Sequence, residues 1–232
     1  MLDTTNLLWY GSITVQFLFC LYLLWTRVAK SFPTFTVYLA VSVVASLCGI
    51  YFMRGAEGAR LPLAYTYYWL CAEPVLLLAQ VAVTLEVHAG MWKGHQSVVR
   101  QTRPLLLFAL LVALMAAGIP VKSELARTGA SHLVAVMHFG FLVTRYVSSV
   151  LAIFLILSAT LFLVAVHNGE TSSLFRHEGM LAAYFGIYAI AMLLVGMGWI
   201  RAIFVNGYLA SALTLCFVLW FTVFKPHSLA SE

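Results

Sequence analysis

The sequence predicts an all-α fold, a polytopic transmembrane bundle of seven helices, and three observations lead to this prediction. Hydrophobic residues make up 63% of the 232 residues and charged residues only 9%, whereas a soluble domain carries about 25% charged residues. The mean hydropathy is +0.97. The few charges fall in short clusters between seven apolar runs, each long enough to cross about 30 Å of hydrocarbon as a helix. A soluble nucleic-acid-binding domain is excluded despite the formal net charge of +5, because membrane loops also carry excess Lys and Arg.

Charges and prolines mark where each span begins and ends. In chain order we expect spans at 7–26, 34–53, 63–87, 104–120, 132–166, 179–199 and 203–224. The boundaries that follow them are Arg27, Lys30 and Pro33; Arg54 through Arg60 with Pro62; Lys93 through Arg103 with Pro104; Pro120 with Lys122; His167 through Glu178; Arg201; and Lys225 with Pro226. Five of the six prolines are therefore expected at span edges, where a missing N–H costs little. The longest loop, about 88–103, is too short to fold alone, so we expect residues 1–232 to form a single transmembrane domain with no soluble domain.

The fifth segment is longer than one crossing requires. Residues 132–166 would reach roughly 52 Å at 1.5 Å per residue. Its first half is the more polar, with His138 and Arg145 among its residues. We therefore expect 132–146 to be a separate or projecting element and the crossing to lie at about 147–166. One strongly tilted helix is the alternative.

The distribution of Lys and Arg predicts the orientation, because these residues are retained on the cytoplasmic side. Seven of them fall in the loops on one side and five in the loops on the other, with Arg145 assigned to a span. The N-terminus is therefore expected outside and the C-terminus inside. The start of the chain lacks the basic segment and cleavage site of a signal peptide, so the first span is expected to remain as an uncleaved anchor.

Glu73 is the residue that composition does not explain. It lies near the middle of the third span, where an ionisable group costs at least about 2.5–3.5 kcal/mol. Pro74 follows it directly and leaves a carbonyl without its usual partner one turn back, near Leu70. Glu73 and Pro74 together predict a kinked, polar floor of a pocket.

Polar residues continue along one face of the third span. Thr66, Glu73, Gln80, Thr84 and His88 follow one another at intervals of seven, seven, four and four residues. A polar stripe facing lipid would be penalised at each position, so we expect this stripe to face the bundle interior. It would line a ligand cavity or an ion path, or else form a hydrogen-bonded seam that sets helix packing.

Arg145 is the obvious cation to pair with Glu73, but helix geometry places the two roughly 12 Å apart in depth. Arginine reaches several ångströms along a span, yet more naturally outward to water. Arg145 is therefore either a partner of Glu73 in the site or a residue of the outer interface.

Aromatic residues gather at the outer ends of the spans, as in an interfacial belt. Tyr65, Tyr67, Tyr68 and Trp69 surround more than one face of the third helix, so some of them must point inward above Glu73. An aromatic vestibule leading to a carboxyl group is a plausible small-molecule pocket, for which Tyr65, Tyr68 and Trp69 are the candidates.

Three histidines expected near the inner face, His88, His167 and His177, are the candidate metal ligands. No HxxxH or HExxH pair places two ligands on one helical face, and only His88 and His167 lie at matching depth for a bis-histidine haem. We therefore predict no cofactor.

Small residues in the spans indicate packing. The four cysteines are expected to be small apolar packers without a disulfide framework. Two small-xxx-small pairs in the sixth span, Gly179/Ala183 and Ala182/Gly186, suit close helix contact within the bundle or with another subunit.

The tract Tyr-Thr-Tyr-Tyr-Trp-Leu-Cys-Ala-Glu (65–73), with Glu86 further down the helix, resembles small bacterial seven-helix proteins of unknown function. The overall plan is similar to the seven-helix input modules of sensor kinases. The resemblance covers chiefly the third span and the span count, and it implies a bacterial inner membrane. A sensor kinase would carry cytoplasmic domains after the last helix, which this sequence does not contain.

Three functions follow as hypotheses. The leading one is a non-enzymatic membrane protein with an outward-facing pocket around Glu73, acting as a receptor-like sensor or as an accessory subunit of a membrane complex. The second is a small solute or proton-coupled transporter that uses Glu73, Gln80, Thr84 and His88. The third is a metal- or haem-dependent membrane enzyme. The expected partners are the lipid bilayer, a membrane protein or second copy, and a small-molecule ligand, but no nucleic acid.

Overall fold

The computed structural model describes residues 4–26, 28–53, 63–128, 132–165, 173–196 and 202–223. Over these ranges the chain forms seven α-helices and one short 3-10 helix, η1, and no strand. Their bounds are α1 Thr4–Trp25, η1 Val28–Lys30, α2 Pro33–Met53, α3 Leu63–Met91, α4 Gln96–Thr128, α5 His132–Ala165, α6 Ser173–Gly196 and α7 Ala202–Val223. The all-α prediction is confirmed.

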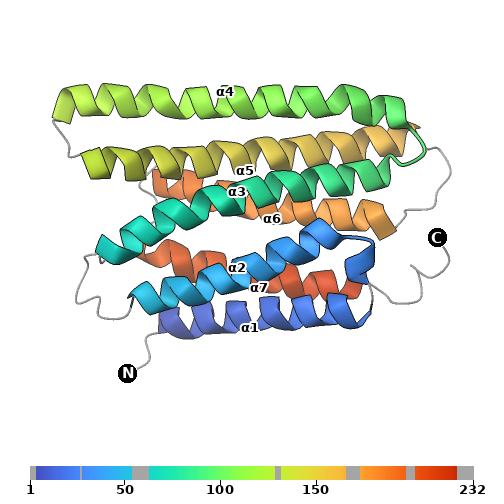
Figure 1. Ribbon diagram of the computed structural model, residues 1–232, viewed down its shortest axis with the longest axis horizontal. Helices are drawn as coiled ribbons and strands as arrows, with labels where there is room; N and C mark the ends of the chain where they lie inside the picture. The colour runs from blue at the N-terminus through green and yellow to red at the C-terminus, as the bar shows by residue number, and fades with distance from the viewer. Residues whose placement is uncertain are drawn as a thin grey trace.

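The helices form an up-and-down bundle with α3 near its centre (Figure 1). Helix α1 packs against α2 and α7, and the chain neighbours α4 and α5, α5 and α6, and α6 and α7 also pack together. Helix α3 contacts α2, α4, α5 and α6. A polar stripe on α3 is therefore surrounded by other helices, whereas α4 lies at the edge of the bundle.

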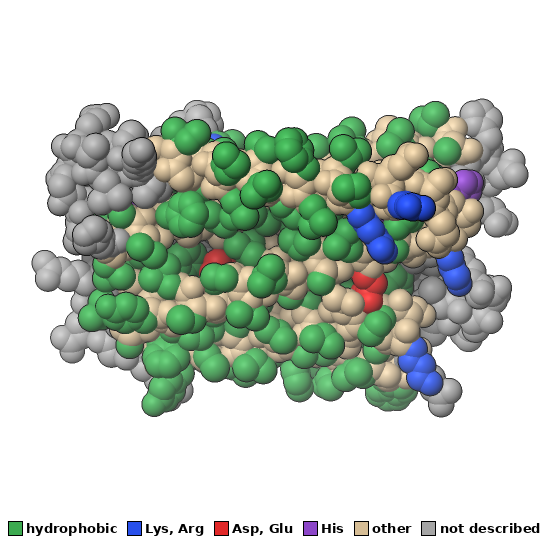
Figure 2. All heavy atoms as spheres, turned by 45° about the horizontal axis from the view of Figure 1, so that its top comes forward, with side chains coloured by type: hydrophobic (Ala, Val, Ile, Leu, Met, Phe, Trp, Pro, Cys, Tyr) green, Lys and Arg blue, Asp and Glu red, His purple; other side chains and the backbone are tan. Residues whose placement is uncertain are grey.

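Five of the helices, α1 to α5, contain described segments long and apolar enough to cross a membrane. Large apolar side chains are exposed along them, for example Leu78 at 72% and Phe108 at 65%. Figure 2 shows one face of the molecule, on which apolar side chains cover most of the surface and Lys and Arg gather toward one end. We call this the basic end; its described cations are Lys30, Lys93, Arg100, Arg103 and Arg176. We call the opposite end, where α1 begins, the N-terminal end.

Helix α4 corrects the expected position of a loop. The sequence predicted a loop over 88–103 and a span over 104–120, but α3 extends to Met91 and α4 begins at Gln96. Pro104 and Pro120 consequently lie inside α4, not at its edges. The physical reason is that a helix can continue into water, so charges at its end mark the edge of the hydrocarbon and not the end of the helix.

Helix α5 corrects part of the expectation for residues 132–146; that they project beyond the crossing stays a prediction. It runs without interruption from His132 to Ala165, over 34 residues, so 132–146 is not a separate element. At 1.5 Å per residue the helix is about 51 Å long. It lies alongside α4, which has 33 residues, and the two long helices pack against each other.

The hydrophobic core fills the bundle between the middle and the basic end. Its largest fully buried side chains include Phe19, Phe35, Phe185, Phe217 and Trp220. Phe19 packs against Phe35, Phe217 and Trp220 with ring centroids 5.8–6.2 Å apart. This aromatic cluster joins α1, α2 and α7 and closes the bundle on that side.

Glu86 on α3 caps the N-terminus of α2. Its Oε1 accepts a hydrogen bond from the backbone N–H of Thr34 at 2.9 Å, and its Oε2 accepts one from the N–H of Phe35 at 3.0 Å. The first N–H groups of a helix have no partner within the helix, and negative charge is favourable there. Pro33 at the first helical position has no N–H to satisfy. Glu86 on α3 therefore serves as the N-cap of α2, a role that a Ser or Asp at the start of the same helix usually has.

Removing this cap should weaken the bundle. We expect Glu86→Ala to lower the free energy of unfolding by about 1–2 kcal/mol, because two helix-terminal N–H groups lose their acceptor. Unfolding by SDS in mixed micelles measures the effect. Glu86→Gln is the matched control, because it keeps one acceptor oxygen and should cost less. Equal stability of Glu86→Ala and the native chain would contradict the role of Glu86 as a cap.

Candidate functional site

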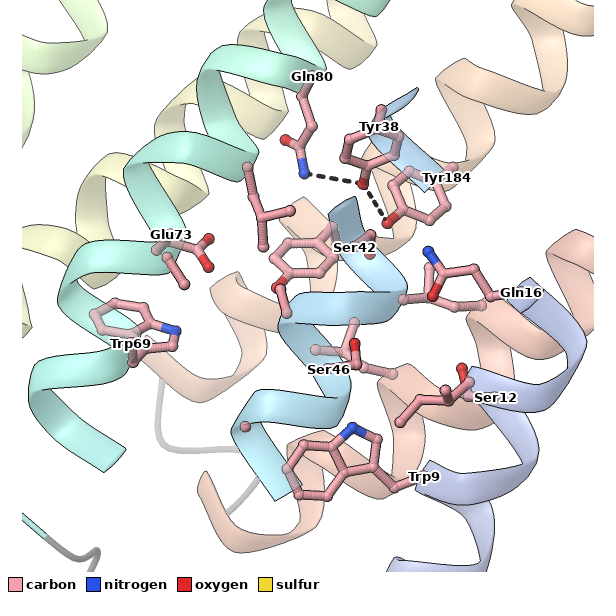
Figure 3. A pocket seen from close by; sticks show the side chains of 18 of the residues that line it. Trp9, Ser12, Gln16, Tyr38, Ser42, Ser46, Trp69, Glu73, Gln80 and Tyr184 are labelled. Carbon is pink, nitrogen blue, oxygen red and sulfur yellow. Dashed lines mark hydrogen bonds between the residues drawn. The ribbon is translucent and has the colours of Figure 1, made fainter. Parts of the chain in front are cut away.

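A partly open cavity of about 230 Å³ lies among α1, α2, α3, α6 and α7, mostly in the half of the bundle toward the N-terminal end. Its lining extends from Trp9, Gly49 and Tyr65, near the helix ends, past the middle of the bundle to Tyr38 and Gln80 (Figure 3). The core described above closes this inner end, and Tyr38 and Phe217 belong to both. The cavity therefore reaches into the bundle from the N-terminal end and stops partway.

The polar stripe of α3 is buried. Thr66, Glu73, Gln80, Thr84 and His88 have exposed fractions of 0–7%. The expectation that the stripe faces the bundle interior is thus confirmed, while its functional role stays a prediction. The structure divides the polar stripe into two parts. Glu73 and Gln80 line the cavity, whereas Thr84 and His88 lie outside the lining, toward the basic end.

Glu73 has a hydroxyl partner from α5. Thr144 Oγ1 donates a hydrogen bond to Glu73 Oε1 at 2.9 Å, and the carboxyl group lines the cavity. Arg145 forms no ion pair with Glu73, and its guanidinium lies over the ring of Tyr146, 5.5 Å from the centroid. Arg145 is thus not paired with Glu73 and is not among the lining residues; its place at the outer interface stays a prediction. Helix α3 continues through Pro74.

Gln80 is at the inner end of the cavity. Its Nε2 donates to the Tyr38 hydroxyl at 3.4 Å, and the hydroxyls of Tyr38 and Tyr184 are 2.7 Å apart (Figure 3). Gln80 Oε1 is buried and has no hydrogen-bond partner among the described residues. Leaving a buried acceptor unsatisfied costs free energy. This oxygen is enclosed by protein atoms and is not exposed to the open part of the cavity.

The aromatic residues at the start of α3 face different directions, because they occupy different positions around the helix. Tyr65, Tyr68 and Trp69 line the cavity, whereas Tyr67 points away and is 55% exposed. The Tyr68 hydroxyl donates to the backbone carbonyl of Ala45, which holds this ring between α3 and α2. Trp9 of α1 completes the aromatic wall.

The wall opposite α3 was missed by the sequence reasoning. It carries small polar side chains from α1 and α2, which are Ser12, Gln16, Ser42 and Ser46 (Figure 3). Each pair is spaced four residues apart, so each lies on one face of its helix. That spacing was the available signal, because polar pairs at helical spacing in apolar spans favour the bundle interior.

Trp69 is held in place by close packing against α5. A Cβ atom added at Gly140 would lie 3.0 and 3.1 Å from two atoms of the Trp69 ring. Such distances are shorter than ordinary van der Waals contact, so any larger residue at 140 must displace the ring. Gly140 therefore sets the position of one wall of the cavity.

We expect Gly140→Ala to lower the free energy of unfolding by about 1 kcal/mol, the lower end of the overpacking range, because the indole can shift toward the cavity. The same shift should narrow the cavity and change the tryptophan fluorescence spectrum. Gly186→Ala is the matched control, because a Cβ there meets no atom within 4 Å. An unchanged stability and spectrum for Gly140→Ala would contradict this packing.

His88 connects three helices near the basic end. Its Nδ1 is 2.8 Å from Ser158 Oγ, and its Nε2 is 2.7 Å from Thr102 Oγ1. Trp92 Nε1–H donates to Ser158 Oγ at 3.1 Å, and Thr102 Oγ1 lies 2.8 Å from the carbonyl oxygen of Val98. Both tautomers fit these partners, because hydroxyl hydrogens rotate. In one, Ser158 donates to Nδ1 and Nε2–H donates to Thr102; in the other, Thr102 donates to Nε2, Nδ1–H donates to Ser158, and the Ser158 hydroxyl is free to face Glu178. In either tautomer, neutral His88 bonds both hydroxyls.

His177 and Glu178 belong to the core, not to a loop. The sequence placed them at a span boundary, but both lie in α6 and both are fully buried. Trp220 Nε1–H donates to His177 Nδ1 at 2.9 Å. Neither oxygen of Glu178 has a hydrogen-bond partner among the described residues, although the Ser158 hydroxyl lies nearby. The chain therefore has a second buried carboxyl group besides Glu73.

The candidate metal ligands do not come together in the part of the chain that is described. There, no three His, Cys, Asp or Glu side chains are close enough to hold a metal ion. His88 uses both ring nitrogens in hydrogen bonds, and His167 lies outside the described residues. The four cysteines are free thiols; Cys20 and Cys216 are buried as packing residues, Cys48 is half-buried and Cys71 is exposed.

The glycines of the sixth span do not mark a close helix contact inside the bundle. A Cβ at Gly179 or Gly186 would meet no atom within 4 Å. The small-xxx-small interpretation is thus wrong for contacts among the described residues. Close approach is seen instead at Gly140 on α5, which begins a row of small residues four apart, Gly140, Thr144 and Ser148.

The chain matches no known family model, no curated protein and no solved structure. Its site is therefore interpreted from its own residues.

Proposed function

We propose that the chain is an integral membrane protein with seven spans, whose cavity opens to the outside and binds a small molecule. It would act as a receptor-like sensor or as the ligand-binding subunit of a membrane complex. The observation that carries this proposal is the cavity itself, which is partly open and is lined by the buried carboxyl group of Glu73 and by other polar side chains. Polar groups at that depth are costly and mark ligand or ion sites.

The orientation is part of the proposal. Seven Lys and Arg of the sequence fall at the basic end and five at the other, with Arg145 within a span; this bias supports placing the basic end in the cytoplasm, which puts the N-terminus and the cavity mouth outside. Helices α6 and α7 would be the sixth and seventh spans, because they pack within the same bundle as the five apolar helices.

Thiol accessibility tests both points. In a background without the four native cysteines, Ser46→Cys lines the cavity and should react in intact cells with a membrane-impermeant thiol reagent. Ser97→Cys is the control, because Ser97 is exposed at the basic end and should react only after the cells are opened. The reverse pattern would overturn the orientation. A Ser46→Cys that reacts from neither side would overturn the open cavity.

A transporter is the second candidate, and one observation favours it. The buried polar groups continue beyond the cavity to His88, Ser158 and Glu178 near the basic end. Apolar core residues such as Val83 and Val87 lie on α3 in the same half, so transport would require a conformation that opens this core. Uptake of a bound solute into proteoliposomes, with loss of uptake in Glu178→Gln, would favour the transporter; binding without uptake favours the receptor.

A further inference from the structure

The chemistry of the cavity wall narrows the class of ligand. Glu73 is the one carboxyl group in the described lining, and this lining contains no Lys, Arg or His. Its hydrogen-bond donor from α5, Thr144, is neutral. An ionised Glu73 thus has no positive partner in the cavity, and a charge at that depth requires one. A cationic ligand would supply it.

The rest of the wall suits the same ligand. Trp9, Tyr65, Tyr68, Trp69 and Tyr188 present aromatic rings to the cavity from α1, α3 and α6. The faces of such rings attract organic cations, and rings that surround a quaternary ammonium group form a recognised type of site. Anionic ligands would face the carboxylate with no cation to compensate, so the wall disfavours them.

The volume and the innermost group limit the size. A cavity of about 230 Å³ has room for about eight waters at about 30 Å³ each, which excludes most drug-sized molecules. At the inner end of the cavity the hydroxyls of Tyr38 and Tyr184 and the side chain of Gln80 are polar, which suits a ligand that carries a hydroxyl or N–H. An amino alcohol has both required features, a cationic head and a hydrogen-bond donor.

We infer that the cavity binds a small organic monocation, a quaternary or protonated amine of about the size of choline, with Glu73 as its counter-ion and the aromatic rings as its walls. This inference rests on the proposed function and specifies its ligand class. The ammonium group replaces water around Glu73, and the aromatic rings exclude further water from the pair.

The experiment uses choline and tetramethylammonium as probes and 3,3-dimethylbutan-1-ol as control. The alcohol has the shape of choline with a neutral carbon in place of nitrogen. Calorimetric titration of the purified full-length protein in detergent should show binding of both cations and at least about tenfold weaker binding of the alcohol. Glu73→Gln should remove this preference, whereas Glu73→Asp, which keeps the charge, should retain it.

Aromatic variants test the walls separately. Tyr65→Leu should weaken choline binding by about threefold or more, and Tyr67→Leu, an exposed tyrosine of the same helix, should leave it unchanged. Choline should also slow the modification of Ser46→Cys, which tests binding even in a variant of reduced stability.

Three results would overturn the inference. These are equal binding of choline and its neutral analogue, an unchanged preference in Glu73→Gln, and no binding of either cation. The accessibility of Ser46→Cys separates this failure from that of the proposed function. A reactive Ser46→Cys without cation binding rejects only the ligand class, whereas an unreactive one rejects the open cavity as well.

Discussion

Replacing His88 by leucine is expected to lower the free energy of unfolding by about 3 kcal/mol. The side chain is 1% exposed and bonds Ser158 on α5 and Thr102 on α4. Leucine restores most of the volume but neither hydrogen bond, and it leaves a buried hydroxyl without its acceptor. SDS unfolding in mixed micelles measures the loss, which should exceed that for removal of the Glu86 cap.

Two controls show whether the loss comes from the hydrogen bonds. His95→Leu changes an exposed histidine near the same end of α3 and should have little effect. The pair His88→Leu and Ser158→Ala should be non-additive, because both remove the same bond. A His88→Leu variant as stable as the native chain would mean that His88 does not connect these helices, and a metal ligand or proton carrier would then be the better interpretation.

The residues facing the bundle interior could be predicted where they follow helical spacing on one helix. Glu73, Gln80 and His88 fall on one side of any regular helix, and an apolar span penalises polar groups toward lipid. Their partners could not be predicted in the same way. Whether Thr144 or its neighbour Arg145 reaches Glu73 depends on how α3 and α5 cross, and no local pattern specifies that crossing.

The errors at helix boundaries have one physical origin. Charged clusters were interpreted as loops, yet Arg100 and Arg103 lie in the first turns of α4 and Arg176 lies in α6. Consecutive residues of a helix point about 100° apart. Arg176 can therefore be exposed while His177 and Glu178, the next two residues, are fully buried. Hydropathy averaged along the sequence does not distinguish exposed from buried positions in the same turn of a helix.

Glu178 is the position where substitution should stabilise the protein. Its carboxyl group is fully buried, and neither oxygen has a hydrogen-bond partner among the described residues. The nearby Ser158 hydroxyl donates to His88 in one of the two tautomeric arrangements. An unsatisfied buried polar group costs roughly 1–3 kcal/mol. Methionine has a similar length and is unbranched, so Glu178→Met should raise the free energy of unfolding by about 2 kcal/mol.

Glu178→Gln is the matched control, because it keeps the shape and leaves a polar group in the same place, and it should gain little. Thermal unfolding in detergent compares the three proteins. A large loss of stability in Glu178→Met would show that the carboxyl group has a stabilising partner, and Glu178 would then be structural. A gain in stability would instead make Glu178 a candidate functional residue, because its carboxyl group would destabilise the core without being needed for folding. The stabilised variant should then be assayed for solute uptake, since loss of uptake in a more stable protein would assign Glu178 to transport.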